Sequence, residues 1–371
     1  MRVTLERSDL LKSLSHVQRV VERRNTIPIL SNVLLKADDG ALTLKATDLD
    51  IEVTETTPAA IDVAGATTVS AHMLYDIVRK LPDGAEVMLA VGDDNGLKLV
   101  SGRSQFRLQM LPEGDFPDLT AGEFSHIFRI GCAEFKGLID RTQFAISTEE
   151  TRYYLNGIYL HGVEDDGEAK LRAVATDGHR LAQAQTKAPA GVDGMPGIII
   201  PRKAVGEVQK LLENSDDTVT IEVSESKIRF TVGPVVLTSK LIDGTFPDYN
   251  RVIPTNNDKH LVLDRATFSS AVDRVSTIAS DRGRAVKLSL SQGQLKLSVN
   301  NPDSGSAEEE IAVGYESDAL DIGFNSRYLL DITNQLSADE TNFMLADPGS
   351  PTLIREKGDS AALYVLMPMR V

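Results

Sequence analysis

The sequence contains no tryptophan and a single cysteine, Cys132, and aromatic residues make up only 5% of its 371 positions. One cysteine excludes an internal disulfide framework and is typical of proteins of the reducing cytoplasm. The longest aliphatic run, Gly197–Ile200, is far too short to span a membrane, and the opening MRVTLERSDL does not resemble a secretion signal. We therefore expect a cytoplasmic protein with no membrane partner.

Signatures of enzyme and metal sites are also missing. The six histidines are scattered without metal-ligand spacing, and neither a GxSxG nor an HExxH motif occurs. The phrase Asp177-Gly178-His179-Arg180 leaves open a general base oriented by a carboxylate, in a hydrolase or transferase. A hydrogen-bonded histidine in a binding pocket is the other interpretation. We expect no catalytic residue, no metal and no cofactor.

What the sequence does contain is a repeat. LPEGDFPDL at Leu111–Leu119 returns as LIDGTFPDY at Leu241–Tyr249, 130 residues later. ATDLDIEV, which begins at Ala46, returns as ATDGHRLA at Ala175, 129 residues later. Two unrelated phrases that recur at nearly one interval indicate repeated domains, and a third copy fits in the remaining length. The sequence predicts three similar domains over residues 1–125, 126–257 and 258–371.

Each third shows the same order of elements, a helix and then strands, twice over. Apolar residues at a 3.6-residue period predict six helices: Ser8–Arg24, Ser70–Leu81, Ala133–Ser147, Pro201–Glu213, Asp264–Ser280 and Asn325–Leu336. Ser8, Ser70, Asp264 and Asn325 are predicted N-caps, and Pro201 is placed in a first helical turn. Alternating strands separate the helices, and Asp39-Gly40 predicts a hairpin turn. The fold class is α+β, with antiparallel sheets covered by helices on one face.

The stretch from Arg152 to Leu181 lies near the middle of the chain. Its two alternating runs, YLNGIYL and LRAVATDGHRLAQA, are separated by the polar segment VEDDGEAK. This pattern predicts a hairpin of two strands, with a kink or bulge at Gly178 in the second.

Charge is divided unevenly between helices and the rest of the chain. The predicted helices carry 14 Lys and Arg against 10 Asp and Glu, whereas the whole chain carries 39 against 54, a net charge of −15. Helix propensity of Lys and Arg is one explanation. A cationic helical face turned toward phosphate, on a protein whose outer surface repels nucleic acid, is the other.

Five phrases in order make the sequence resemble a known family: RYYLNG, ATDGHRLA, PRKAV, TSKLIDGTFPDY and YVLMPMR. They look like the bacterial DNA polymerase III beta subunit family, the replication sliding clamps, and the resemblance covers the whole chain. It implies a DNA clamp fold and a head-to-tail dimeric ring that encircles double-stranded DNA without reading sequence. It also implies a non-catalytic processivity factor, opened by a clamp loader, that tethers the replicative polymerase alpha subunit and other proteins with clamp-binding motifs. An interaction scaffold without a DNA role is the competing hypothesis.

The resemblance also implies three sets of site residues. DNA would be contacted by Lys12, Arg24, Arg79, Arg152, Tyr153, Tyr154, Arg202 and Lys203, where either tyrosine could equally serve packing. A partner peptide would bind between the second and third domains, at Leu155, Thr176, Gly178, His179, Arg180, Leu181, Pro247, Arg251, Val252, Asn325, Tyr328, Leu345, Val365, Leu366, Met367, Pro368, Met369 and Arg370. The dimer interface would contain Arg103, Phe106, Arg107, Leu108, Thr277, Ile278, Glu308, Glu309 and Glu310.

Without the resemblance, Leu155, Leu181 and Val252 would be assigned to the core. Three positions depart from the family pattern. Glu149 stands where some members have Gln, and His72-Met73 stand where an Arg-Lys pair can occur, so the predicted DNA surface is less positive. Gly283 stands where an aromatic residue can occur, which would open one wall of the peptide pocket.

Overall fold

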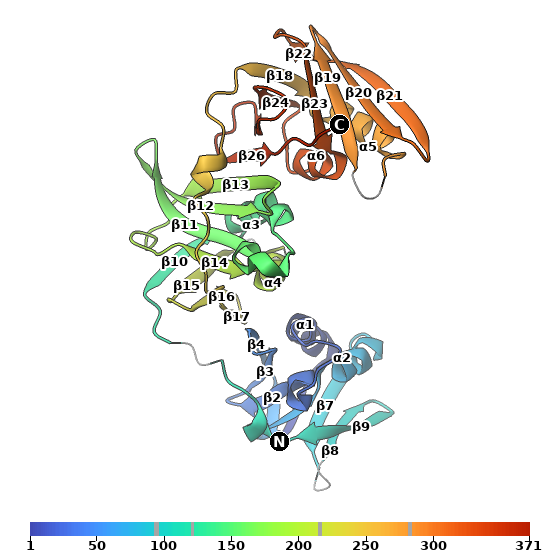
Figure 1. The fold of residues 1–371 in the computed structure, drawn as a ribbon. Coiled ribbons are helices and arrows are strands. Elements are labelled where there is room, and N and C mark those ends of the chain that lie inside the picture. The colour runs from blue at the N-terminus through green and yellow to red at the C-terminus, as the bar shows by residue number, and fades with distance from the viewer. Residues whose placement is uncertain (93–95, 120–121, 214–216, 281–283) are drawn as a thin grey trace. The chain divides into compact units, whose positions relative to one another are not determined.

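The computed structural model describes residues 1–92, 96–119, 122–213, 217–280 and 284–371 (Figure 1). A strand and a helix followed by antiparallel strands recur twice in each third of the chain. The first third contains β1 (Arg2–Glu6), α1 (Arg7–Val17), β2 (Asn32–Asp38), β3 (Ala41–Thr47), β4 (Ile51–Pro58), β5 (Ala60–Val63), β6 (Gly65–Ser70), α2 (Ala71–Lys80), β7 (Glu86–Val91), β8 (Gly96–Ser101) and β9 (Ser104–Leu111).

The second third repeats this order without the extra strand of the first. It contains β10 (His126–Gly131), α3 (Cys132–Thr142), β11 (Gly157–Asp165), β12 (Glu168–Thr176), β13 (Arg180–Lys187), β14 (Ile198–Pro201), α4 (Arg202–Leu212), β15 (Thr218–Val223), β16 (Lys227–Val232) and β17 (Val235–Lys240). The last third contains β18 (Lys259–Asp264), α5 (Arg265–Ser276), β19 (Ala285–Ser291), β20 (Gln294–Asn301), β21 (Gly305–Ala312), β22 (Gly314–Tyr315), β23 (Leu320–Asn325), α6 (Ser326–Thr333), β24 (Glu340–Leu345), β25 (Thr352–Glu356) and β26 (Ala362–Leu366). The predicted internal doubling is therefore present, and the antiparallel α+β class is confirmed.

The chain forms two compact units, and the division passes through the middle third. The first unit contains residues 1–136, 189–193 and 203–241, and the second contains residues 137–188, 194–202 and 242–371. The first holds a sheet in the order β10-β15-β16-β17-β4-β3-β2-β6-β9-β8-β7-β1-β5, and the second holds two sheets, β14-β11-β12-β13-β26-β25-β24-β18-β22 and β21-β20-β19-β23.

Successive thirds are joined by antiparallel strand pairing within each unit. In the first unit β17 pairs with β4, with Leu237 opposite Val53. In the second unit β13 pairs with β26, with Leu181 opposite Val365. Because the ladder hydrogen bonds continue across these junctions, neither sheet stops at the border of a repeat.

Helices cover one face of the sheets, and their apolar stripes explain why. In α1 the buried residues Leu10, Leu14 and Val17 recur at helical spacing and lie against β3 and β4. In the second unit α5 and α6 lie side by side against the four-stranded sheet (Figure 1). Phe268 of α5 also meets Phe343 of β24 edge-on, with 5.4 Å between ring centroids.

The predicted helices exist, but all were predicted too long. The helix predicted over Ser8–Arg24 ends at Val17, although Val20 and Val21 beyond it are still buried. Side-chain caps are confirmed at three predicted positions: Ser70, Asp264 and Asn325 each accept a backbone N–H of the first turn.

Two predicted helix starts are wrong. Ser8 lies inside α1, whose N-cap is Glu6 without a side-chain hydrogen bond. Pro201 is the last residue of β14, where Gly157 of β11 is its partner, so strand pairing overrides its preference for a first helical turn.

The central stretch departs from its prediction in two places. The run LRAVATDGHRLAQA is two strands, β12 and β13, paired with each other and joined by a turn at Asp177–His179. Gly178 is the centre of that turn and has φ +87°, which explains the glycine. Residues Glu150–Leu155 form 3-10 turns interrupted by a kink at Arg152, so the strand predicted from Tyr154 begins only at Gly157. The Asp39-Gly40 hairpin is confirmed, with φ of 48° and 76°.

Candidate partner groove and nucleic-acid interface

The turn between β12 and β13 is fixed by its own side chains. Oδ1 of Asp177 accepts the backbone N–H groups of His179 (2.9 Å) and Arg180 (3.0 Å). The Thr176 hydroxyl accepts from the N–H of Gly178 (3.1 Å) and donates to the carbonyl of Arg180 (2.7 Å). Short polar side chains that satisfy the backbone in this way explain why the sequence TDGHR turns here.

Arg180 is a buried cation with a full set of partners. Its guanidinium bonds to the carboxylates of Asp177 (3.1 Å) and Asp331 (2.6 Å) and donates to the carbonyl of Phe144 (2.7 Å). It also lies over the rings of Phe144 and Tyr328, 5.0 and 4.3 Å from their centroids. A buried, fully paired Arg stabilises its surroundings, so Arg180 supports the pocket and its charge is not available to a ligand.

His179 is exposed and stacks on Tyr328, with 6.3 Å between ring centroids. Both border a pocket of about 380 Å³ lined by Gln143, Phe144, Ile146, Ser147, Thr148, Glu149, Asp177, His179, Arg180, Arg202, Arg327 and Tyr328. Its exposed cations are Arg202, the first residue of α4, and Arg327 near the start of α6. The pocket combines aromatic faces with several polar groups that could fix the orientation of a bound chain.

Several predicted groove residues belong instead to a hydrophobic cluster of the second unit. Leu155, Leu181 and Val365 are 3%, 2% and 1% exposed and pack with Val174, Ile199, Phe246, Tyr249, Leu353 and Leu363. Leu345 and Leu366 are fully buried. These five residues can form the floor beneath a groove but offer little surface of their own.

Other predicted groove residues are accessible. Val252 and Met367 are 46% and 40% exposed, and Pro247 is exposed as well. The assignment of Val252 to the core is therefore wrong, whereas that of Leu155 and Leu181 is correct. Arg251 is also exposed and pairs with Asp248 at 2.9 Å.

The end of the chain is held by backbone hydrogen bonds. The N–H of Met367 donates to the carbonyl of His179 (2.9 Å), and the N–H of Met369 donates to that of Gly323 (2.8 Å). Of the remaining predicted members, Asn325 caps α6, Pro368 is half-buried and Arg370 is exposed.

The predicted DNA residues fall into two groups. Lys12, Arg24 and Arg202 are exposed, as is Arg79, which pairs with Asp76 at 3.1 Å. Lys203 is instead bound to Glu22 and Asp48, each at 2.5 Å. Burial alone would raise the pKa of Asp48, but the Lys203 ammonium and two backbone N–H groups outweigh it and hold this pKa below its usual value.

The two tyrosines that follow Arg152 differ in exposure. Tyr153 is 53% exposed, whereas Tyr154 is half-buried and packs against the hydrophobic cluster. The two rings meet edge-on with 5.8 Å between centroids. Tyr153 is thus free to contact a ligand, and Tyr154 serves packing.

Most of the predicted interface residues lie on two strands, β9 and β21, whereas Thr277 and Ile278 follow α5. Within the described residues, β9 pairs with β6 only at Met110 and Leu111, so no strand is paired with residues 104–109 on that side. On β9 Phe106 is 37% exposed and Leu108 is 5% exposed, and Arg103 precedes the strand. β21 is the last strand of its sheet.

The acidic run on β21 already has partners in its own chain. Glu309 pairs with Arg274 of α5, Glu308 with Lys296, and Glu310 accepts from Gln294. Thr277, which caps the end of α5, is exposed, and Ile278 is half-buried.

Sequence reasoning missed pocket residues such as Phe144 and Arg327, and it also missed Asp331, which bonds to Arg180. No local pattern marks Asp331, because its partner Arg180 lies 151 positions away in the chain. His72, one of the positions that depart from the family pattern, has a structural role: its Nε2 lies 2.9 Å from the carbonyl of Val21. Gly283 lies outside the described residues.

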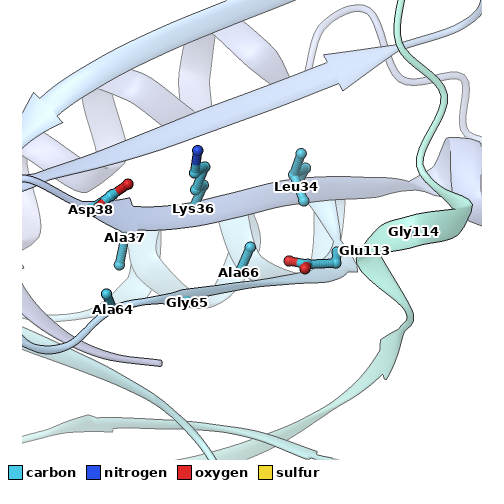
Figure 2. Close-up of a pocket in the computed structure, with 9 residues that line it drawn as sticks. All are labelled: Leu34, Lys36, Ala37, Asp38, Ala64, Gly65, Ala66, Glu113 and Gly114. Carbon is cyan, nitrogen blue, oxygen red and sulfur yellow. The ribbon is translucent and has the colours of Figure 1, made fainter.

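A separate depression of about 490 Å³ lies in the first unit, beside β2 and β6 (Figure 2). Lys36 and Ala37 project to opposite sides of β2, as successive residues of a strand must. The other residues that line the depression mostly have small side chains or none: Ala64, Gly65, Ala66 and Gly114. Leu34, Asp38 and Glu113 complete the lining. No predicted residue lies here, and we assign it no role.

Comparisons with known proteins agree with this geometry. Models of the N-terminal, central and C-terminal domains of the DNA polymerase III beta subunit match residues 1–120, 129–248 and 250–370. The beta sliding clamp of Caulobacter vibrioides is 53% identical over 372 residues, which is all of both chains. A sliding clamp of Bartonella birtlesii bound to griselimycin superimposes with a TM-score of 0.98, at 63% identity and full coverage of both chains. A Caulobacter crescentus beta sliding clamp also gives a TM-score of 0.98, at 53% identity over all of this chain and 99% of the other.

The repeated sheets and the matches define a class of protein, the DNA sliding clamps, which are non-catalytic processivity factors of DNA replication. The chain belongs to the DNA polymerase III beta subunit family. The hydrolase or transferase hypothesis for His179 is thereby excluded. In the part of the chain that the structure describes, no helix is long and apolar enough to cross a membrane.

Proposed function

We propose that two copies of this chain close head to tail into a ring around double-stranded DNA, each contributing domains 1–125, 126–257 and 258–371. The support is the pair of open strand edges, since an unpaired edge is a template for a strand of another chain. A contact between β9 of one copy and β21 of the next joins two different surfaces. Such a heterologous interface closes a ring when its rotation permits.

The side chains of these edges are complementary. Phe106 provides an exposed apolar centre, with Thr277 and Ile278 as its counterpart on the partner. Arg103 and Arg107 bring positive charge toward the acidic run at residues 308–310. An apolar centre with a charged rim is the usual anatomy of a specific interface. Because Glu309 is already paired with Arg274, the charges steer association more than they strengthen it.

On DNA, the exposed Lys12, Arg24, Arg79 and Arg202 contact phosphates, with Tyr153 as an accessible aromatic. Phosphate contacts carry no sequence information, so the ring can slide. Closure around the duplex, and not affinity, keeps the protein at its site and raises the effective concentration of whatever it carries.

Partners bind the groove over the hydrophobic cluster, between the polar pocket and the rim of Pro247, Val252 and Met367. The replicative polymerase alpha subunit, the clamp loader and other proteins with a short clamp-binding motif share it, in the cytoplasm at the nucleoid. A sliding clamp of Bartonella birtlesii is bound to griselimycin, and we expect griselimycin to bind this groove in the present protein. The observation that carries this assignment is that the exposed apolar residues Pro247, Val252 and Met367 lie close, along the chain, to buried members of the hydrophobic cluster.

Loading on circular DNA tests the ring. With a clamp loader and ATP, the protein should stay on nicked circular DNA and leave when the circle is cut once. Only a ring slides off a free end, so retention on the linear molecule would show a scaffold that binds DNA directly.

Light scattering tests the stoichiometry independently. The mass should be close to twice 40.3 kDa at micromolar concentration. A monomer or a trimer would contradict the two-copy ring, whatever the result on DNA.

A further inference from the structure

One face of the second unit carries a row of polar residues across three strands. His161 of β11 is opposite Arg172 of β12, which is opposite Gln185 of β13. Tyr249 lies over this row and is only 5% exposed, and its hydroxyl is 3.2 Å from Nη1 of Arg172 and 3.0 Å from Nε2 of His161. A tyrosine from a different part of the chain is thus fixed to the sheet by its hydroxyl.

The direction of these hydrogen bonds follows from the partners. Nδ1 of His161 is 3.1 Å from the carbonyl of Gly162, which can only accept, so Nδ1 carries the proton. Burial, with Arg172 nearby, lowers the pKa of His161, so the ring is neutral and its Nε2 accepts. Arg172 therefore donates to the Tyr249 hydroxyl, which in turn donates to His161.

Arg172 is held rigidly enough to orient this hydroxyl. It is 7% exposed, and its Nε and Nη2 donate to Oε1 of Gln185 at 2.9 and 2.7 Å. Asp165 lies 3.0 Å from Nη2 and also accepts from Gln185 at 2.7 Å. The buried guanidinium is thus paired, and the group that contacts Tyr249 has one orientation.

The residues just before Tyr249 are fixed on the same face. The Phe246 ring is stacked on Tyr159 with 4.8 Å between centroids and 5° between planes. Tyr159 is stacked in turn on His161 at 4.7 Å. Pro247 lies between the two anchored residues Phe246 and Tyr249, and Val252 follows three positions later. Two of the three exposed rim residues, Pro247 and Val252, are therefore placed by this anchor.

The first repeat shows that the fold itself does not need the anchor. There Leu119 stands where the second repeat has Tyr249, and the strand pair carries Thr43 opposite Thr56 in place of Arg172 opposite Gln185. Its FPD phrase is held differently, by an ion pair of Lys45 with Asp118 at 2.9 Å and a hydrogen bond from the N–H of Leu119 to Glu52. The chain of hydrogen bonds from Arg172 through the Tyr249 hydroxyl to His161, here called the hydroxyl relay, occurs in the second of these two repeats. In that repeat the FPD phrase borders the proposed groove.

We propose that Arg172, acting through the Tyr249 hydroxyl onto His161, is a positioning residue that sets the Pro247–Val252 rim of the partner groove. It does not touch the partner. It holds the rim in one conformation relative to the hydrophobic cluster. Binding of a partner chain therefore does not cost the conformational entropy of ordering the rim. This inference rests on the proposed groove.

Tyr249→Phe tests the relay because it removes only the hydroxyl. With griselimycin as the probe in isothermal titration calorimetry, this substitution should weaken binding roughly three- to tenfold. Hydrogen exchange should become faster at the amides of Asn250, Arg251 and Val252. Unchanged affinity in a folded variant would overturn the inference, whatever the exchange rates.

Tyr315→Phe is the matched control. Tyr315 is also buried, and its hydroxyl donates to the carbonyl of Asp318 at 2.6 Å, but it lies on β22, at the far edge of the sheet from the groove. This variant should lose thermal stability and bind griselimycin like the wild type. Equal losses of affinity in both variants would indicate a general effect of stability and would count against the relay.

A double-mutant cycle separates positioning from packing. Arg172→Lys keeps the charge and loses the planar fork, so it should weaken binding, and combination with Tyr249→Phe should add little. Additive losses would mean that the two residues act independently, which contradicts the relay. If the wild type does not bind griselimycin, the groove assignment fails first; if it binds and Tyr249→Phe binds equally, only this inference fails.

Discussion

Glu149 holds Arg152 in a bidentate ion pair: Oε2 accepts from Nε at 2.9 Å and Oε1 lies 2.8 Å from Nη2. The hydrogen bond from Arg152 lowers the pKa of Glu149, so the carboxylate stays ionised at neutral pH. Nη2 of Arg152 also donates to the carbonyl of Asp177 at 3.0 Å. A residue predicted to contact DNA is thus neutralised by the neighbour at which this sequence departs from the family pattern.

Glu149→Gln should therefore strengthen the contact with DNA. The substitution removes one negative charge and releases the Arg152 guanidinium toward phosphate, so the slope of log K against log salt should steepen by about one. The measurement is duplex binding by fluorescence anisotropy from low to moderate salt. Glu150→Gln is the matched control, because it removes the same charge without releasing Arg152. Equal effects of the two substitutions would show that Arg152 does not reach DNA.

Removal of Met367–Val371 should abolish griselimycin binding and leave the dimer intact. The deletion takes away an exposed rim residue and the two backbone hydrogen bonds that Met367 and Met369 donate to His179 and Gly323. Calorimetry and light scattering on the same sample measure both properties. Removal of Val371 alone retains those hydrogen bonds and every predicted groove residue, and it should retain binding. A monomeric deletion variant would contradict the assignment of the interface to β9 and β21.

Phe106→Ser should weaken dimer association by about 2 kcal/mol, roughly thirtyfold, since a central aromatic is the usual energetic anchor of an interface. Sedimentation equilibrium measures the dissociation constant. Ile127→Ser is the control, because Ile127 is 55% exposed on β10 and equally apolar, and it should dimerise normally. A dimer unaffected by Phe106→Ser would place the interface elsewhere.

Tyr364→Phe should stabilise the protein by about 1 kcal/mol. A buried hydroxyl without a hydrogen bond destabilises the folded state, and the substitution removes that penalty. Tyr364 is 1% exposed, its hydroxyl has no hydrogen-bond partner among the described residues, and burial raises its pKa. Urea unfolding measures the change. Tyr315→Phe, which loses a satisfied hydroxyl, should change stability in the opposite direction. A destabilised Tyr364→Phe would mean that this hydroxyl has a partner in solution.

Periodicity located the elements better than it located their ends. The apolar stripe of α1 continues to Val20 and Val21, and both are buried, but the helix stops at Val17 because buried apolar residues do not have to be helical. Asp264 and Asn325 were correctly predicted as caps because a cap depends only on residues three positions away. Pro201 was misplaced because its partner in β11 lies far away in the chain.

The candidate groove was predictable only in part. Pro247, Val252 and His179 were named through the family resemblance, and all three are exposed. The sequence does not indicate that Arg180 is hydrogen-bonded to Asp331 and Phe144, or that Lys203 forms ion pairs with Glu22 and Asp48. These partners come into contact only when the chain folds.

By itself the sequence determined the repeated unit, its elements and the hairpin turn at Asp39-Gly40, because periodicity, caps and turn residues act over a few positions. Only the tertiary structure decided which cations remain exposed, which strand edges stay open and which tyrosine hydroxyl is anchored. Those properties depend on residues that are tens to more than a hundred positions apart in the chain and come into contact only when the sheets assemble.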